Sequence, residues 1–534
     1  MHVTLALLVG SVLPAAPVAN LDFADGRLTG WTGQGFYVTT GSAGPSLRFG
    51  VCSSDRGPMG RIALLHRTFV VPPGAGAIHF TAALVRPDGL GASAPLEVTL
   101  EAAESHFIPR QVRTAQGWKP APRLLPFVKG RPHEYLWPVS DLIGQTVRIV
   151  LRDDDDRPGC FVFCSGFRIL SADAWNGREF ASFMHGLERT HHLAPMTRLD
   201  SKHFLAIGNA ADEYTEERLY NCETIYALFF DHFRKKGFKV REPGVRLMVA
   251  VFDSQSGFEA YLGLRMSAAA TGVYHPPTNR LVVYDYAQNR SFIANKKQGE
   301  QMVGQIRSTL DRQRLSGQFS HFAQTRRADA NIGTIMHEVA HQLSFNGGLL
   351  NREGDVPLWL AEGLACYCEA TTNGSWQGIG EPNLERVNTL AGPARGQGTF
   401  IPLRHLLAGD DWLRRATDVR QVLLGYAQSW ALFRMLMEQN PRGLRNYLAL
   451  VYSRRTPDYR LADWAQAFGT DLAAFENQYQ GYMRTPGPSR IAPRPVSRSL
   501  GLGGRDHGTG VALLRAAQRL PEGTPCRRGL KITP

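Results

Sequence analysis

Residues 331–369 read NIGTIMHEVAHQLSFNGGLLNREGDVPLWLAEGLACYCE, and this stretch decides how the chain around it is interpreted. Apolar side chains recur at helical spacing through its first half, at Ile332, Ile335, Met336, Val339, Ala340 and Leu343. That period predicts an amphipathic helix. We expect Asp329 or Asn331 to cap its start and the pair Gly347 and Gly348 to end it.

This helix places two imidazoles on one face. His337 and His341 are four residues apart in the segment HEVAH, and side chains with that spacing are neighbours on a helix. Two imidazole nitrogens suit zinc as ligands. Glu338, between them, lies close enough to accept a proton from a zinc-bound water. The segment therefore predicts a metal site with its own base.

A second helix is predicted to supply the third ligand. Asp355 can cap it, and Pro357 is tolerated in a first turn, where its missing N–H needs no partner. Glu362 and Glu369 are seven residues apart and share one face, while Gly363 would let the two helices approach closely. Two histidines and Glu362 leave one zinc position open, as catalysis requires. The expected buried stripe is Leu360, Ala361, Leu364, Ala365 and Cys368.

The HEVAH segment followed by WLAEGLA resembles the gluzincin metallopeptidases, the superfamily that contains thermolysin and related aminopeptidases. The resemblance implies an α+β zincin-like domain that hydrolyses peptide bonds of a peptide or protein substrate. It implies His337, His341 and Glu362 as Zn²⁺ ligands and Glu338 as general base. The wider stretch more closely resembles an uncharacterised bacterial family with a peptidase-like domain.

Further roles follow from this resemblance and from position. Gluzincins stabilise the reaction's oxyanion with a Tyr or His from a downstream helix, and Tyr426 is the first candidate here, ahead of His405, Tyr274 and His275. Glu369 is a candidate partner for the second nitrogen of a metal-bound histidine. An ordinary surface glutamate is the alternative interpretation of Glu369.

A hairpin is predicted upstream of the metal helix, because strand-like runs flank the turn residues 276–279. In gluzincins the edge strand of the sheet binds extended substrate through its main chain. By resemblance that strand would be Gly272, Val273 and Tyr274, or else residues 281–284. The alternative is a hairpin fully paired inside the sheet. Local patterns also predict strands at 200–207 and 245–251 and helices at 211–236 and 254–262.

Composition places the chain among multidomain globular proteins. It has 534 residues, of which 43% are hydrophobic and 20% charged, with a net charge of +13. Basic residues are scattered and no nucleic-acid motif occurs, so no nucleic-acid partner is expected. Beyond the first residues, no run approaches the ~18–20 apolar residues of a membrane span.

Four regions are expected along the chain. Residues 1–19 resemble a signal peptide, which predicts a secreted, periplasmic or cell-envelope protein, although a buried N-terminal segment is the alternative. Short strands over 20–172 predict an all-β sandwich. Its opening, NLDFADGRLTGWT, and the later run WPVSDLIGQTVRIVLRD resemble galactose-binding-like jelly rolls, and this resemblance implies a domain that binds carbohydrate or acts as a scaffold. Residues 173–484 would be the metallopeptidase domain with a helical C-terminal part, and 485–534 a basic, mostly disordered Pro/Gly/Arg tail.

Three functions remain open from the sequence. The first is a secreted zinc peptidase whose sandwich positions or binds substrate. The second is a catalytically inactive metal-binding scaffold, or a carbohydrate or cell-surface binding protein, that retains the peptidase fold. In the third, the sandwich is a carbohydrate-binding module and the zinc domain trims glycoproteins or cell-wall peptide.

Overall fold

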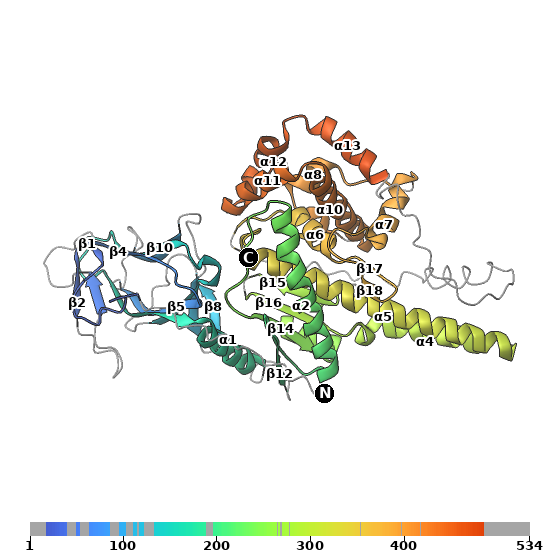
Figure 1. Cartoon of the computed structure of the whole chain (residues 1–534), viewed down its shortest axis with the longest axis horizontal. Helices are drawn as coiled ribbons and strands as arrows, with labels where there is room; N and C mark the ends of the chain where they lie inside the picture. The colour runs from blue at the N-terminus through green and yellow to red at the C-terminus, as the bar shows by residue number, and fades with distance from the viewer. Residues whose placement is uncertain are drawn as a thin grey trace, which may run out of the picture.

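The structure is a computed structural model in which a strand-rich N-terminal part precedes a part where helices surround a central sheet (Figure 1). It describes residues 18–39, 50–53, 63–85, 96–102, 110–114, 117–121, 133–187, 196–263, 265–266, 270–276, 278–352, 354–396, 398–416 and 418–484. The predicted tail at 485–534 and all but the end of the predicted signal peptide lie outside these ranges.

The N-terminal part is a sandwich of two antiparallel sheets. One contains, in spatial order, β1 (Thr32–Gln34), β4 (Ala63–Val70), β10 (Thr146–Asp153) and β6 (Leu96–Ala102). The other contains β2 (Phe36–Thr39), β3 (Gly50–Ser53), β11 (Phe161–Ser171), β5 (Ala75–Val85), β9 (His133–Pro138), β7 (Arg110–Thr114) and β8 (Gly117–Ala121). Alternate side chains of both sheets, such as Leu65, Ile149 and Phe80, share one core. The predicted β-sandwich is therefore confirmed, while its jelly-roll relationship stays a prediction.

Helix α1 (Ala172–Gly186) follows β11 without a break and lies where the two parts meet. Trp175 on this helix packs against Ala77 and Leu136 of the sandwich and against Val245 of the following part. The short helix η1 (Ser140–Leu142) also lies at the end of the sandwich.

The second part is built on a mixed five-stranded sheet. Its order is β12 (Thr197–Asp200), β13 (Phe204–Gly208), β14 (Leu247–Phe252), β16 (Arg280–Tyr284) and β15 (Gly272–His275). The three inner strands are parallel and the two outer ones antiparallel. The inner strands are nearly continuous apolar runs because side chains on both faces of the sheet are buried.

The strand predicted at 200–207 is confirmed over 204–207, but its start is wrong because the chain turns between β12 and β13. The carboxylate of Glu223 accepts hydrogen bonds from the Ser201 hydroxyl at 2.6 Å and from the His203 N–H at 2.7 Å. Those bonds hold the turn, and their acceptor lies on a different element, so the local pattern could not show it.

Helices cover this sheet and form the C-terminal part, as predicted. They are α2 (Asp212–Lys235), α3 (Gln255–Leu262), α4 (Arg290–Gly304), α5 (Thr309–Asn346), α6 (Leu358–Cys368), α7 (Leu384–Ala394), α8 (Leu403–Ala408), α9 (Asp411–Arg414), α10 (Val419–Gln439), α11 (Pro441–Ser453), α12 (Arg460–Phe468) and α13 (Leu472–Arg484). Shorter elements are η3 (Tyr286–Gln288), η4 (Pro457–Tyr459) and the small pair β17 (Thr371–Thr372) and β18 (Ser375–Trp376). In the described ranges, every helix is too short or too polar to cross a membrane.

The predicted start of the metal helix is wrong. Helix α5 begins about twenty residues earlier, at Thr309, where the Ser308 hydroxyl accepts a hydrogen bond from the Asp311 N–H. Asn331 lies inside the helix, and its side-chain oxygen accepts instead from the Tyr286 N–H at 2.8 Å. The predicted end is confirmed, because α5 stops at Asn346 before Gly347 and Gly348.

The predicted cap of the second helix is also wrong. Helix α6 begins after Pro357, and Asp355 forms an ion pair with Arg460 at 2.7 Å in place of a cap. The predicted stripe is buried, together with every other residue from Trp359 to Cys368. The close approach at Gly363 is made to α10, where a Cβ on Gly363 would lie 2.4 Å from the Ser429 carbonyl oxygen.

We predict that Gly363→Ala destabilises the protein by about 2–3 kcal/mol, because backbone rather than a mobile side chain blocks the added methyl group. Thermal unfolding of the purified chain measures the effect. The matched control is Gly317→Ala in α5, which has open space around its Cβ and should be neutral or stabilising by up to about 1 kcal/mol. Equal melting temperatures for the two variants would contradict the packing argument.

Candidate metal centre

Helices α5 and α6 bring three predicted ligands to one point. The Nε2 atoms of His337 and His341 are 3.1 Å apart. An Oε2 atom of Glu362 lies 3.1 Å from the first nitrogen and 3.4 Å from the second. All three residues are less than a tenth exposed. The structure thus assembles two nitrogens and one oxygen in a small buried triangle.

The triangle fits a zinc ion. Ligands about 2.0–2.1 Å from a tetrahedral ion lie about 3.4 Å from one another, close to the distances between these atoms. Two neutral imidazoles and one carboxylate are also a donor set that zinc accepts. Burial raises the pKa of the Glu362 carboxyl, but His341 and His337 outweigh it and leave this pKa lowered, so the oxygen ligand is ionised.

Glu369 fixes the orientation of the His337 ring. Its Oε2 atom lies 2.5 Å from Nδ1 of His337 and accepts a hydrogen bond from that nitrogen, which leaves Nε2 as the nitrogen that a metal ion would bind. Glu369 is the residue at which α6 ends, and it is only 9% exposed, which rules out the surface interpretation.

Two residues of α7 hold Glu369 from the other side. Its Oε1 atom accepts hydrogen bonds from Asn383 Nδ2 at 2.9 Å and from Arg386 Nε at 2.8 Å. Burial raises the pKa of Glu369, but Arg386 and His337 together lower it to about 2. Glu369 therefore stays ionised and keeps its hydrogen bond to the histidine.

Cys366 could in principle complete a second ligand group with Glu369 and Nδ1 of His337. Its Sγ atom lies 4.0 Å from that nitrogen, and burial raises the pKa of the thiol. Because the Arg386 guanidinium already neutralises Glu369, a second cation there would face an adjacent positive charge. We interpret this group as the support of the triangle.

The predicted base, Glu338, is held by the neighbouring strand. Its Oε2 atom accepts a hydrogen bond of 2.6 Å from the backbone N–H of Tyr274 in β15. Burial raises the pKa of Glu338, and the charge of Glu362 raises it further, against the opposing effect of the two histidines. A carboxyl with a raised pKa next to a metal site suits proton transfer.

Strand β15 is the edge of the sheet, and it lies against α5 (Figure 1). Residues 281–284, the other predicted edge, lie in β16 between two paired strands and cannot serve. A Cβ on Gly272 would lie 2.5 Å from Thr334 and 3.1 Å from Glu338, so only glycine allows the helix this close. In a strand, the main-chain N–H and C=O groups of every second residue point to the same side. Because the Tyr274 N–H points away from β16, toward Glu338, the main-chain groups of Gly272 also point away from β16.

Tyr426 lies beside the triangle. Its ring centre is 6.2 Å from that of His337, and Arg386 lies over the same ring at 5.5 Å. Burial and the charge of Glu362 raise the pKa of Tyr426 well above its usual value, so the phenol keeps its proton. The Tyr426 hydroxyl makes no hydrogen bond within the described ranges, which leaves it free to donate one.

The three other oxyanion candidates are placed less well. The Tyr274 hydroxyl donates to Asn279 at 2.8 Å, and its ring stacks on Phe345. His275 is hydrogen-bonded to Thr278 in the exposed turn. His405 is exposed on α8, and no ring contact or hydrogen bond joins its side chain to the triangle in the part of the chain described.

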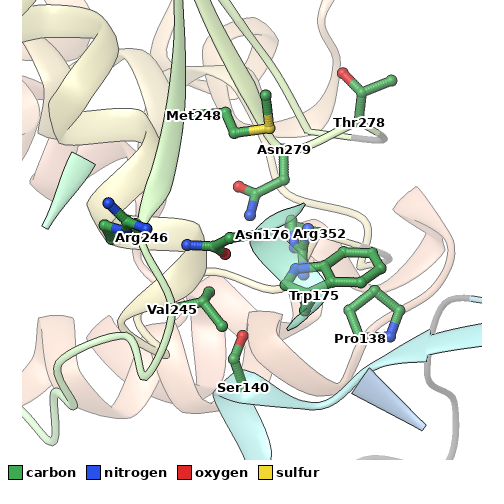
Figure 2. A pocket seen from close by; sticks show the side chains of 10 residues that line it. All are labelled: Pro138, Ser140, Trp175, Asn176, Val245, Arg246, Met248, Thr278, Asn279 and Arg352. Carbon is green, nitrogen blue, oxygen red and sulfur yellow. The ribbon is translucent and has the colours of Figure 1, made fainter. Parts of the chain in front are cut away.

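A small hollow lies away from the triangle, where the sandwich meets the second part (Figure 2). Its lining includes Trp175 and Asn176 of α1 and, from the second part, Arg246, Asn279 and Arg352. Asn279 also accepts a hydrogen bond from the Tyr274 hydroxyl. One residue that lines the hollow therefore also contacts strand β15. None of the triangle's residues lines the hollow.

Comparisons with known proteins leave the function unassigned. Residues 331–458 match the model of a protein family of unknown function, DUF1570. The matched segment of this chain includes the triangle, Glu369 and Tyr426. No curated protein matches the chain.

Among solved structures, the chain is similar to the module TmCBM61 in complex with β-1,4-galactotriose, with 12% identity, 29% of this chain and 97% of that chain covered, and a TM-score of 0.18. It is also similar to one of the carbohydrate-binding modules of the β-sandwich superfamily, with 15% identity, 28% and 60% coverage and a TM-score of 0.17. At these TM-scores neither likeness bears on function.

Sequence reasoning missed Asn383 and Arg386. Both act on Glu369 from α7, which follows a loop, and neither stands in a motif or at a fixed spacing from the triangle. An Asn at a helix N-cap is an ordinary signal for a helix start and gives no hint of this second contact.

We predict that Arg386 controls metal affinity only through Glu369. Glu369→Gln and Arg386→Met should each weaken zinc binding about 10- to 100-fold, and the double variant should bind about as well as Glu369→Gln alone. Competition with a chromophoric chelator measures the affinities, and Arg395→Met, at the exposed end of α7, is the control. Losses that add up in the double variant would show that Arg386 acts by another route.

Proposed function

We propose that this chain is a zinc-dependent hydrolase of peptide bonds. The observation that carries the proposal is the convergence of His337, His341 and Glu362 beside a carboxylate, Glu338, that is tied to the edge strand of a sheet. A purely structural zinc site has four protein ligands and no need of a neighbouring base. The triangle has three ligands and such a base, which favours catalysis.

The residues divide the chemistry between them. A zinc ion held by the triangle would supply Lewis-acid polarisation of the substrate carbonyl. Glu338 accepts one proton from the attacking water while the water oxygen bonds to the carbonyl carbon. Glu338 then delivers that proton to the departing amine nitrogen as the carbon–nitrogen bond breaks. The Tyr274 N–H fixes the Glu338 carboxylate during both transfers.

Strand β15 is the proposed contact for substrate. The outward main-chain groups of Gly272 and the carbonyl of Tyr274 offer an extended peptide the pairing of an added strand. Val273 directs its main-chain groups to β16, and its partly buried side chain packs against the cluster that contains Met248 and Tyr284, so it supports the edge strand from behind. A peptide in that position lies along α5, next to Glu338.

Tyr426 is the proposed donor to the oxyanion. Its phenol is protonated, it lies next to His337, and its ring is held by Arg386 and by Trp412 at 5.9 Å between ring centres. A donor held rigidly in a dry site stabilises developing charge without reorganising.

Carbohydrate binding by the sandwich and export of the chain stay separate proposals. The sandwich has the two-sheet architecture that the sequence resemblance implies, and a glycan array probed with the whole chain tests its ligand. The mass of the chain recovered from its native host tests removal of residues 1–19.

Replacing Glu338 by Gln should abolish hydrolysis and leave zinc stoichiometry at one per chain, because an amide keeps the shape of the side chain but accepts no proton. Casein and a broad peptide library serve as substrates, with zinc measured by metal analysis. Removing the metal with a chelator should abolish hydrolysis in the wild type, and adding zinc should restore it. Zinc binding without cleavage by the wild type would favour the inactive scaffold.

Tyr426→Phe should lower kcat about 10²- to 10³-fold with little change in KM or zinc affinity, because the lost hydrogen bond forms only in the transition state. His405→Phe is the matched control, since His405 is exposed and should leave kcat unchanged. A normal kcat for Tyr426→Phe would exclude it as the donor.

A further inference from the structure

Helices α4 and α5 form an arm that leaves the rest of the described chain (Figure 1). The arm comprises α4 and the first twenty residues of α5, residues 290–328. Few side chains pack between its two helices. The Phe319 ring lies directly against Gly299, and Val303 and Ala323 are buried. Nothing in the triangle requires α5 to extend so far.

The tip of the arm exposes apolar side chains. Helix α4 ends at Gly304 and α5 begins at Thr309, so Met302 and Leu310 flank the turn. Leu310 is 79% exposed, more than any other exposed large hydrophobic side chain in the described ranges, and Met302 is 36% exposed. Leu310 and Met302 thus give the tip an apolar surface that no other part of the described chain covers.

The arm is also strongly basic. Residues 290–328 contain eight lysines and arginines and two acidic residues. At the base, Arg290 pairs with Glu259 and Arg327 with Asp285. Nearer the tip, Arg307 and Arg314 have no carboxylate partner in the described part of the chain. Two of the arginines without a carboxylate partner therefore lie beside the apolar tip, where Asp311 is the one acidic residue in 305–314.

We propose that this tip docks on an anionic phospholipid bilayer. Exposed apolar side chains enter the headgroup region, and the surrounding arginines are attracted to its negative charge, a pairing of two signals that each bind weakly alone. A protein partner would need about 800 Å² on each side for a stable complex, far more than a narrow convex turn presents. A flat charged surface fits the shape and the charge of the tip better.

Docking in this way would set the distance of the metal centre from the bilayer. Leu310 and His337 lie on the same helix, and the rise of 1.5 Å per residue separates them by roughly 40 Å. The triangle would then lie well outside the lipid, where it could reach a polypeptide anchored in or near the membrane. The docking itself does not depend on the proposed hydrolysis.

Sedimentation of the full chain with vesicles tests the proposal. The chain should bind vesicles with about one third anionic phosphatidylglycerol, bind pure phosphatidylcholine at least about tenfold more weakly, and lose binding as salt is raised. Leu310→Gln and the pair Arg307→Gln with Arg314→Gln should each reduce binding to the anionic vesicles about tenfold or more. The matched control is Leu228→Gln with Arg404→Gln, two exposed positions on α2 and α8.

Circular dichroism should be unchanged in these variants, because none of the substituted side chains is buried. Failure of the wild type to bind anionic vesicles would overturn the proposal, as would wild-type binding by the tip variants. If light scattering shows that the wild type self-associates and that Leu310→Gln abolishes this, the tip contacts a second copy and the lipid proposal is wrong.

Discussion

The hydrogen bond between Glu369 and Nδ1 of His337 is the contact on which the site depends. It keeps a proton on Nδ1, and so leaves Nε2 as the nitrogen that a metal ion would bind. Two carboxylates contact this imidazole: Glu362 of α6 lies at Nε2, and Glu369, the residue directly after α6, lies at Nδ1. The two ring nitrogens are therefore both contacted from α6 and the residue that follows it, so a shift of α6 would alter the Glu362 and Glu369 contacts together.

Electrostatics explain why so many elements meet at this point. Three glutamates, at 338, 362 and 369, lie in a region of low exposure, where each unpaired charge would cost several kcal/mol. The compensation comes from several elements: the histidines of α5, the Tyr274 N–H of β15 and Arg386 of α7. A divalent cation in the triangle would add to that compensation, so metal binding and the stability of the surrounding fold should be linked.

The sequence predicted those features whose partners are close together along the chain, and missed those whose partners are distant. The apolar period of 332–343 and the spacing of His337 and His341 are local, and the structure contains the helix they predict. The helix starts were wrong because their polar residues bind distant partners: Asp355 pairs with Arg460, and Asn331 contacts Tyr286. Whether Gly272 to Tyr274 formed an edge depended on the order of strands, which no local pattern encodes. Arg386 could not have been found for the same reason.

The length of α5 has a mechanical consequence. From Thr309 to Asn346 it is one uninterrupted helix without proline, so we expect it to move as a rigid unit. Its C-terminal end is buried in the core, whereas its N-terminal end is exposed. A force on the N-terminal end would be transmitted along the helix to its buried end, where His337 and His341 lie on the helix face toward α6. A tilt of only a few degrees about the buried end would shift the tip by several ångströms while moving the imidazoles by a small fraction of that distance. The chain can therefore accommodate a large displacement at one end of this helix and keep its ligand geometry at the other.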